Sequence, residues 1–460
     1  MPILKTDEIT NNLTHKKAPS HSEGAINKVL PFATTKKYVK GSFQPLLGDY
    51  VRNITQIKPK KQKTSSLDAL GVDPLVYSIE KSINPEGQLQ HELENFLQYY
   101  LYGEKENIKL IHPYIYNYLQ GSDSDNLFRK VAKCASDVLV KNDQRIANIF
   151  KDTKTEDVLS ELIIGALNSS TTDDNHPAEK GYQCKLGFLN KLYCEDLIYI
   201  SRHHEYFIKS LPTLTHFYFF TYICQLMLKF ERFDKGDYTT STPLYYALDW
   251  EGVISKRRKA ASDMDGFKRI KQKAPLLFPH IHTMSQLSTF HGNTENSFFV
   301  YPELIEYFSD SGKEQEYLDD VNDWIKQYRQ IFGERVTPKE QAGDLRTAIG
   351  LLFESIKEGM NEGARIGYGN SIEHFGSEFL RTRGSSGTIL MLNHEMLLLL
   401  TAVSVKDKRI PINQLFSEYE KRGVALDRHS KKVVLETLDN LNFIDKKSDS
   451  GDAQYVKPIL

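Results

Sequence analysis

Apolar residues recur with the period of an α-helix along most of this chain, and this pattern limits the possible folds more than any other feature. Leu89, Leu93, Phe96, Leu97 and Tyr100 fall at positions i, i+4, i+7, i+8 and i+11, which places them on one face of a helix. Similar spacings recur at residues 127–139, 158–167 and 321–328. Helices with one apolar face bury it against one another. The sequence therefore predicts a mainly α, multi-part helical protein.

The most apolar run lies at residues 214–228 and contains His216, Thr221 and Gln225. It is shorter than the roughly 20 predominantly apolar residues that span a bilayer, so we expect a buried core helix. The first residues lack the apolar segment of a secretory signal. The 4 Cys residues include no Cys-x-x-Cys pair, which is typical of a reduced intracellular protein. We therefore expect a cytoplasmic protein that makes no membrane contact.

Charge and composition divide the chain into four parts. Residues 1–64 hold 12 Lys and Arg against 4 Asp and Glu, although the whole chain has a net charge of −1. We expect this basic N-terminal arm either to lie in solvent, partly ordered against the body, or to lie on nucleic-acid phosphates. A helical domain at 65–250 and a second helical region at 251–387 follow. That second region contains a basic patch and ends in a Gly-rich connector, with 7 Gly in residues 359–387.

Residues 388–460 are predicted to form a winged-helix-like domain, which contains three helices and a β-hairpin. Asn393 can cap the first helix, which runs to Val405; a second begins near Ile412 and is closed by Gly423; Asp427 can cap the third. Two short strands follow, on either side of a Gly-containing turn at residues 448–452. This part has its own set of apolar positions, so we expect it to fold alone. Earlier, the capping box at Thr337–Glu340, with Pro338 at the first helical position, predicts a helix that runs towards Gly359.

Two clusters of basic side chains are candidate DNA-binding sites. The first contains Lys256, Arg257, Arg258, Lys259, Lys268 and Arg269. The second contains Arg428, His429, Lys431 and Lys432, at the start of the third terminal helix. In a helix-turn-helix domain this end of the recognition helix enters the major groove, where Arg and Lys read guanine or hold phosphate. The alternative is a solvated helix face, and the acidic residues Asp449 and Asp452 at the wing tip would repel phosphates.

Motifs for catalysis are missing from the sequence. It contains no Gly-x-x-x-x-Gly-Lys-Ser/Thr and no Gly-x-Ser-x-Gly, and Gly367-Tyr368-Gly369 lacks the third glycine of a dinucleotide loop. His280-Ile281-His282, read as the end of a strand, is the best metal candidate. Further His and Asp at the ends of later strands would be needed, so we interpret it as a structural pair beside Pro279. Cys184, Cys194, His203 and His204 do not have the spacing of a zinc site. We expect no catalytic residues, no metal and no cofactor.

The C-terminal sequence resembles the DptG family (also called DndG), which belongs to bacterial DNA-phosphorothioation-dependent restriction. The similar segments are EMLLLL at 395–400, FSEYEKRG at 416–423, the ending at 447–460 and RTRG at 381–384. The resemblance covers the last ~80 residues and supplies no catalytic motif. It implies a subunit that acts with DptF-like and DptH-like partners, which carry the nucleotide-driven motor functions. It also implies restriction of DNA that lacks the phosphorothioate mark, as part of antiviral defence.

Together these features predict a non-catalytic accessory or bridging subunit of such a restriction complex, in contact with double-stranded DNA, with the motor subunits, or with both. Two alternatives stay open. One is a nuclease with a dispersed active site, which would use His280 and His282. The other is a pure protein scaffold whose winged helix binds only partner proteins.

Overall fold

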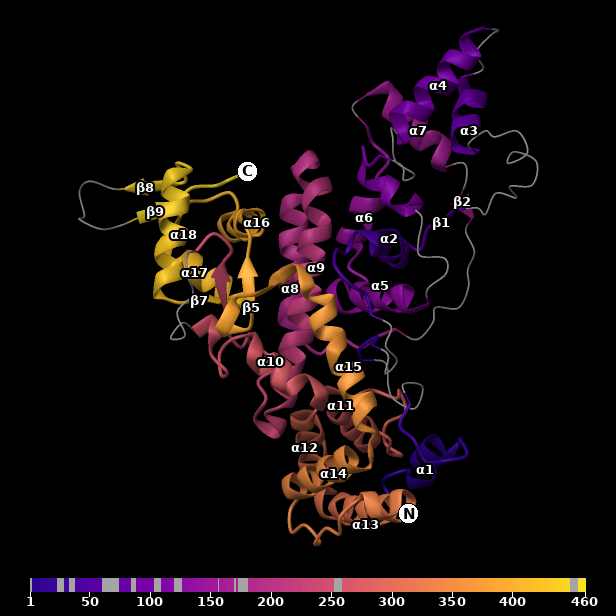
Figure 1. Ribbon diagram of the computed structural model, residues 1–460. Helices are drawn as coiled ribbons and strands as arrows, with labels where there is room; N and C mark the ends of the chain where they lie inside the picture. The colour runs from indigo at the N-terminus through magenta and orange to yellow at the C-terminus, as the bar shows by residue number, and fades with distance from the viewer. Residues whose placement is uncertain are drawn as a thin grey trace. The chain divides into compact units, whose positions relative to one another are not determined.

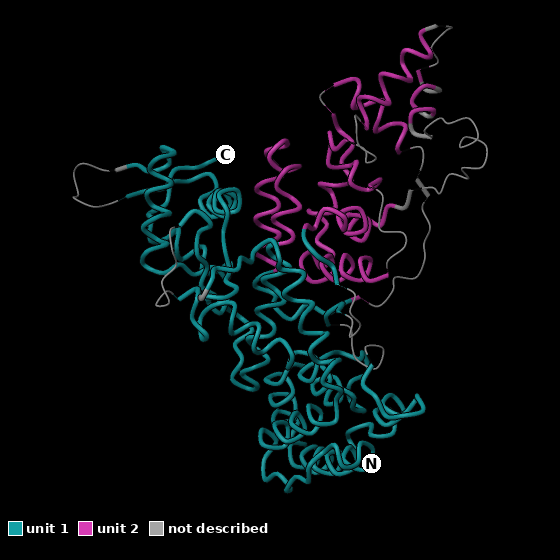
Figure 2. Tube along the Cα trace, viewed as in Figure 1, with its two compact units in different colours: residues 1–41, 182–189, 217–460 teal, residues 42–181, 190–216 magenta. Residues whose placement is uncertain are grey.

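The computed structural model describes residues 2–22, 29–32, 38–59, 74–83, 88–102, 109–119, 126–155, 157–168, 171–172, 181–251, 259–446 and 454–460. As predicted, the protein is mainly helical (Figure 1). It forms two compact units: unit 1 contains residues 1–41, 182–189 and 217–460, and unit 2 contains residues 42–181 and 190–216 (Figure 2). Helices α8 (Gly187–Ile200) and α9 (His204–Phe230) contribute residues to both units. The four parts expected from the sequence have boundaries that differ from those of these two units. That division into four parts stays a prediction.

Unit 2 is a helical assembly with one short antiparallel strand pair. Its remaining helices are α2 (Leu47–Thr55), α3 (Pro74–Ile83), α4 (Gln88–Tyr102), α5 (Asn126–Leu139), α6 (Gln144–Lys151), α7 (Val158–Asn168) and the 3-10 helices η2 (Gln44–Leu46) and η4 (Pro113–Tyr118). Strand β1 (Lys58–Pro59) pairs with β2 (Thr171–Thr172). A chain of buried hydroxyls ties α2 to α8 and α9: Tyr50 lies 2.6 Å from Tyr193, and Tyr193 lies 2.9 Å from Thr215.

The remaining α-helices belong to unit 1. They are α1 (Thr6–Thr14), α10 (Phe267–Lys273), α11 (Leu277–Leu287), α12 (Tyr301–Asp310), α13 (Glu314–Phe332), α14 (Leu345–Gly359), α15 (Glu362–Phe375), α16 (His394–Val405), α17 (Ile412–Lys421) and α18 (Arg428–Asn440). Short 3-10 helices connect them: η5 (Phe233–Lys235), η6 (Lys259–Ala261), η7 (Ala274–Leu276), η8 (Gly333–Arg335), η9 (Ser377–Phe379) and η10 (Gly384–Ser386).

The apolar run at 214–228 is a buried core helix, as predicted. All of these residues lie in α9 and are buried. Two polar side chains in its C-terminal half, Gln225 and Lys229, are satisfied by the segment that follows the helix. Gln225 exchanges two hydrogen bonds of 2.7 Å with the backbone of Thr242, and Lys229 Nζ donates to the Thr240 carbonyl at 2.8 Å. No helix in the described ranges is both long and apolar enough to cross a bilayer.

A four-stranded sheet joins segments that are distant in sequence. Its order is β4-β5-β3-β7, formed by β4 (Leu380–Thr382), β5 (Thr388–Leu392), β3 (Leu244–Leu248) and β7 (Val424–Leu426). β3 is parallel to both β5 and β7, and β4 is antiparallel to β5. Residues 388–460 therefore do not contain the whole of the sheet to which they contribute two strands.

The terminal helices lie where the sequence predicts them. Asn393 accepts the Met396 N–H at 2.8 Å, and Asp427 accepts those of His429 and Ser430 at 2.9 Å. Gly423 closes α17 with a φ of +84°. The predicted hairpin is β8 (Ile444–Lys446) and β9 (Gln454–Val456), which form a sheet of order β6-β9-β8 with β6 (Ile410–Pro411). Strand β7 separates α17 from α18 and belongs to the other sheet.

Three local predictions were wrong. Residues 337–344 are not helical: Thr337 binds Glu358 instead, and α14 begins at Leu345 behind Asp344, which accepts the Thr347 N–H. The expected Gly-rich connector contains α15, because glycines are tolerated in a helix where a neighbouring backbone approaches closely. A Cβ at Gly369 would lie 2.6 Å from the Ala274 carbonyl carbon. His280 and His282 lie on α11, not at the end of a strand.

The described start of the expected N-terminal arm, residues 2–22, is packed in part against the rest of unit 1, while Lys16 and Lys17 are exposed. Leu4 forms an isolated β-bridge with Phe290, and the N–H groups of Ile3 and Leu4 donate to the Asp320 carboxylate. Ile9 and Leu13 of α1 are buried. Residues 2–22 are therefore held against unit 1 by backbone pairing and by apolar burial. Much of the arm's positive charge, including Lys28, Lys36, Lys37 and residues 60–64, lies outside the described residues.

Candidate nucleic-acid interface

The exposed surface of α18 carries the second of the two clusters that the sequence predicts to bind DNA. Its solvent-exposed residues include Arg428, His429, Lys432 and Glu436, which share one face of the helix. Arg428 makes no ion pair with the described part of the chain. Lys432 pairs with Glu436 at 3.7 Å. The positive charge of this face therefore lies in its N-terminal half. Of its two permanently charged cations, Arg428 is the one that has no carboxylate partner in the described ranges to compete with a phosphate.

Lys431 of the same helix is held by its neighbours. Its ammonium group lies 3.6 Å from the Glu420 carboxylate and 5.1 Å from the centre of the Phe416 ring. The side chain of Asp427 occupies the N-terminus of α18 by accepting two backbone N–H groups. A phosphate would meet the Arg428 side chain rather than free helix N–H donors. The wing-tip residues Asp449 and Asp452 lie outside the described residues.

The described cations of the other predicted cluster, Lys259, Lys268 and Arg269, already have partners. Lys268 lies 3.3 Å from Asp263, and Arg269 lies 3.1 Å from Glu231, which also binds Lys273 at 3.0 Å. Lys259 lies over the Tyr245 ring, 4.5 Å from its centre. Exposed ion pairs contribute only about 0–1 kcal/mol, so phosphates could compete for some of these groups. Lys256, Arg257 and Arg258 lie outside the described residues.

The carboxyl ends of the parallel strands form a polar edge that sequence reasoning missed. Asp249 follows β3 and Asn393 follows β5, and the Asp249 N–H donates to the carbonyl of Leu392 at 2.9 Å. The Trp250 and His394 rings are stacked, with centroids 3.6 Å apart and planes inclined by 23°. Ligands of open α/β sheets commonly bind at such edges. The available signal was a short apolar run followed at once by Asp-Trp-Glu or Asn-His-Glu.

Two arginines of the β4–β5 hairpin approach this edge. Arg383 Nη2 donates to the Asp249 carbonyl at 2.7 Å and lies 3.2 Å from its carboxylate. Arg381 Nε is 4.0 Å from the same carboxylate. One carboxylate therefore faces two guanidinium groups and leaves this part of the surface net positive. The predicted cluster approaches the hairpin through Lys268, since a Cβ at Gly387 would lie 3.6 Å from Lys268 Cε.

His280 and His282, the metal candidates, do not converge on a common site. They are two residues apart on α11, so their side chains diverge around the helix. His280 Nδ1 is hydrogen-bonded to the Tyr301 hydroxyl at 2.9 Å, and burial lowers its pKa to about 3. The His282 ring contacts the edges or faces of Phe278 and His21. Within the described ranges, no group of three His, Cys, Asp or Glu side chains could hold a metal ion.

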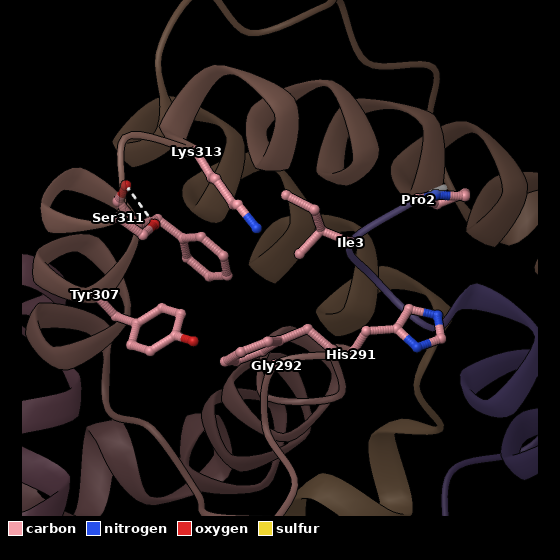
Figure 3. A pocket seen from close by; sticks show the side chains of 9 residues that line it. Pro2, Ile3, His291, Gly292, Tyr307, Ser311 and Lys313 are labelled. Carbon is pink, nitrogen blue, oxygen red and sulfur yellow. Dashed lines mark hydrogen bonds between the residues drawn. The ribbon is translucent and has the colours of Figure 1, made fainter.

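A small cavity lies where the N-terminal segment meets α12 (Figure 3). It has a volume of about 210 Å³ and is lined by Ile3, Phe290 and Phe308 together with polar groups of Tyr307 and Lys313. The Tyr307 hydroxyl and the Lys313 ammonium group point into it, whereas the His291 imidazole turns away (Figure 3). Its lining includes no acidic residue and none of the basic residues predicted to contact DNA. A scan against protein-family models and a search of curated proteins both gave no match to this chain.

Proposed function

We propose that this protein is a non-catalytic accessory subunit of a bacterial phosphorothioation-dependent restriction complex, and that it contacts double-stranded DNA through the N-terminal half of α18. The observation that carries the DNA contact is the exposure of Arg428 and His429 at the start of the third terminal helix. This is the end of a helix that enters the major groove in helix-turn-helix proteins. The winged-helix interpretation of residues 388–460 is part of the proposal.

The charge arrangement favours an accessory role over independent tight binding. Lys268, Arg269, Lys431 and Lys432 each pair with a carboxylate of the same chain, at 3.1–3.7 Å. Because each of these cations already has a partner, few counterions would be released from DNA and the affinity of the chain alone would be modest. Partner subunits would supply the remaining affinity. The resemblance to the DptG family assigns these partners as DptF-like and DptH-like motor subunits in the cytoplasm.

The test measures the salt dependence of duplex DNA binding by the full-length chain. Fluorescence anisotropy would compare the wild type with Arg428→Gln/Lys432→Gln, and with Lys326→Gln/Arg346→Gln as a control of equal charge. The control residues are exposed cations that pair with Asp323 and Asp234. We expect the slope of log affinity against log salt to fall by up to about 1.8 in the first variant, since each lost phosphate contact removes about 0.9. The control should not change the slope.

Co-purification with the DptF-like and DptH-like subunits separates the alternatives. If the α18 variant binds DNA normally but no longer assembles, the terminal region is a protein-docking module and the scaffold interpretation replaces ours. Cleavage of plasmid DNA by the purified chain with Mg²⁺ or Mn²⁺, lost in His280→Ala or His282→Ala, would instead establish the nuclease alternative.

A further inference from the structure

An open cleft lies between the C-terminal end of α15 and the exposed edge of the β4–β5 hairpin. Its volume is about 420 Å³, within the range of roughly 300–1,000 Å³ that is typical of small-molecule sites. Asn370 and Ser377 line one wall, and Arg381, Thr382 and Thr388 line the other. Leu380 is the one aliphatic residue in the lining, and the other residues each carry a polar group. A ligand could therefore make both polar and apolar contacts here.

The side chains of the cleft are mainly hydrogen-bond donors. Arg381 Nη1 donates to the Leu380 carbonyl at 2.9 Å, which fixes the guanidinium group while Nη2 has no acceptor among the described residues. The Thr382 and Thr388 hydroxyls lie 3.5 Å apart, across the strand pair. Ser377 Oγ accepts the Gly41 N–H at 3.1 Å, so its own hydrogen remains free to donate. One guanidinium and three hydroxyl groups therefore surround the cleft.

The charges of the cleft also favour an anion. Glu373, its one acidic lining residue, is neutralised by Lys271 at 3.1 Å. His374 is stacked on Tyr38, with ring centroids 4.1 Å apart. Burial, and then the nearby charge of Lys40, lower the pKa of His374, so its ring is neutral at neutral pH. Within the described ranges, Asp249 is the one carboxylate paired with Arg381, at 4.0 Å.

We infer that this cleft binds a nucleoside phosphate, with the phosphate group on Arg381 and the hydroxyls of Thr382 and Thr388. Arg, Thr, Ser and Asn are among the side chains that hold phosphate oxygens, and the planar guanidinium matches these oxygens with two parallel hydrogen bonds. The cleft is larger than a phosphate group alone requires. Asn370 and Glu373 offer an amide and a carboxylate to sugar hydroxyls or to a base edge. This site is separate from α18 and does not rest on the function proposed above.

Isothermal titration of the full-length protein at low ionic strength would test the inference with adenosine 5′-monophosphate, adenosine and a single-stranded oligonucleotide. We expect the nucleotide or the oligonucleotide to bind and adenosine not to bind. Arg381→Gln should weaken binding by roughly tenfold, and Arg346→Gln, which removes an exposed arginine elsewhere, should leave it unchanged. Thr388→Val keeps the strand-forming shape, removes one hydroxyl, and serves as a second variant if Arg381→Gln lowers the melting temperature.

The two sources of the phosphate give different results. Binding of the mononucleotide identifies a free nucleotide as the ligand, and binding of the oligonucleotide alone identifies a nucleic-acid strand. Equal binding of adenosine and adenosine monophosphate, or no binding of any probe, would overturn the inference, as would equal effects of Arg381→Gln and Arg346→Gln. The Arg428→Gln/Lys432→Gln variant should bind the mononucleotide like the wild type, so a failure of the α18 proposal is distinguishable from a failure of this one.

Discussion

Leu248 of β3 pairs in parallel with Leu392 of β5, although the long helical segment from α10 to α15 separates them in the chain. On its other side, β3 pairs with β7. The central strand of this sheet therefore lies outside the terminal region that it completes.

We expect a fragment of residues 388–460 to lack a cooperative thermal transition, because without β3 the strands β5 and β7 lose the strand between them. The apolar pattern alone predicts the opposite, an independently folded domain. Circular dichroism melting of the fragment checks this. A sharp transition, together with dispersed amide resonances, would show that the terminal region can replace β3 or does not need it.

Replacing Gly350 and Gly369 by alanine should change the free energy of unfolding in opposite directions. A Cβ at Gly369 would lie 2.6–2.8 Å from backbone atoms of Ala274 and Pro275, so Gly369→Ala forces α15 and η7 apart and should cost about 1–3 kcal/mol. Gly350 lies inside α14 with nothing near its Cβ position, so Gly350→Ala should stabilise by up to about 1 kcal/mol.

Chemical denaturation of both glycine variants gives the two free energies of unfolding. If Gly369→Ala stabilised the protein as much as Gly350→Ala, the close approach of the two backbones would not be the reason for the glycine at position 369.

Acid should destabilise unit 1 through His280. Burial lowers its pKa from 6.5 to about 3, so the folded protein keeps it neutral while the unfolded chain takes up a proton. Its contribution to stability is complete above pH 6.5 and is lost as the pH falls towards 3, by up to about 1.4 kcal/mol for each pH unit. The melting temperature of the wild type, measured from pH 7 to pH 4, should therefore fall.

His280→Asn, which keeps an amide near the position of Nδ1, should show a smaller fall over the same pH range, although it is less stable at pH 7. The exposed His91 provides the control, and His91→Gln should follow the wild type. An unchanged slope in His280→Asn would mean that other groups cause the acid sensitivity.

Glu231 holds two cations of α10 at once: Arg269, which belongs to the predicted DNA-binding cluster, and Lys273. Glu231→Gln would release Arg269 and Lys273, so we expect tighter duplex DNA binding with a salt slope steeper by up to about 1.8. The loss of stability should stay near 1 kcal/mol, since both pairs are partly exposed. Glu354→Gln, which breaks the surface pair with Lys357, is the matched control in the same anisotropy assay. Unchanged binding would place this segment away from DNA.

Some features encoded by neighbouring residues were predictable from the sequence, although the helix start at Thr337 was not. Features that depend on distant pairing were missed. The caps Asn393 and Asp427 act within three residues of themselves, so their helices were placed correctly. Strand β3 has only five residues, all of them apolar or tyrosine, and a run of that length cannot be distinguished from a piece of buried helix. The edge formed by Asp249 and Asn393 arises only when β3 meets β5. Likewise, the paired state of Arg269 depends on Glu231, which follows the distant helix α9.

The central position of β3 also affects how the protein can be made. During synthesis, β3 emerges well before β5 and β7, so an unpaired apolar strand must wait until the chain is nearly complete. Such a strand is a template for pairing with other chains, and contacts between distant segments form slowly. Chains shortened at the C-terminus would keep β3 without its neighbours, and we expect their loss to aggregation to exceed what the missing residues alone would cause.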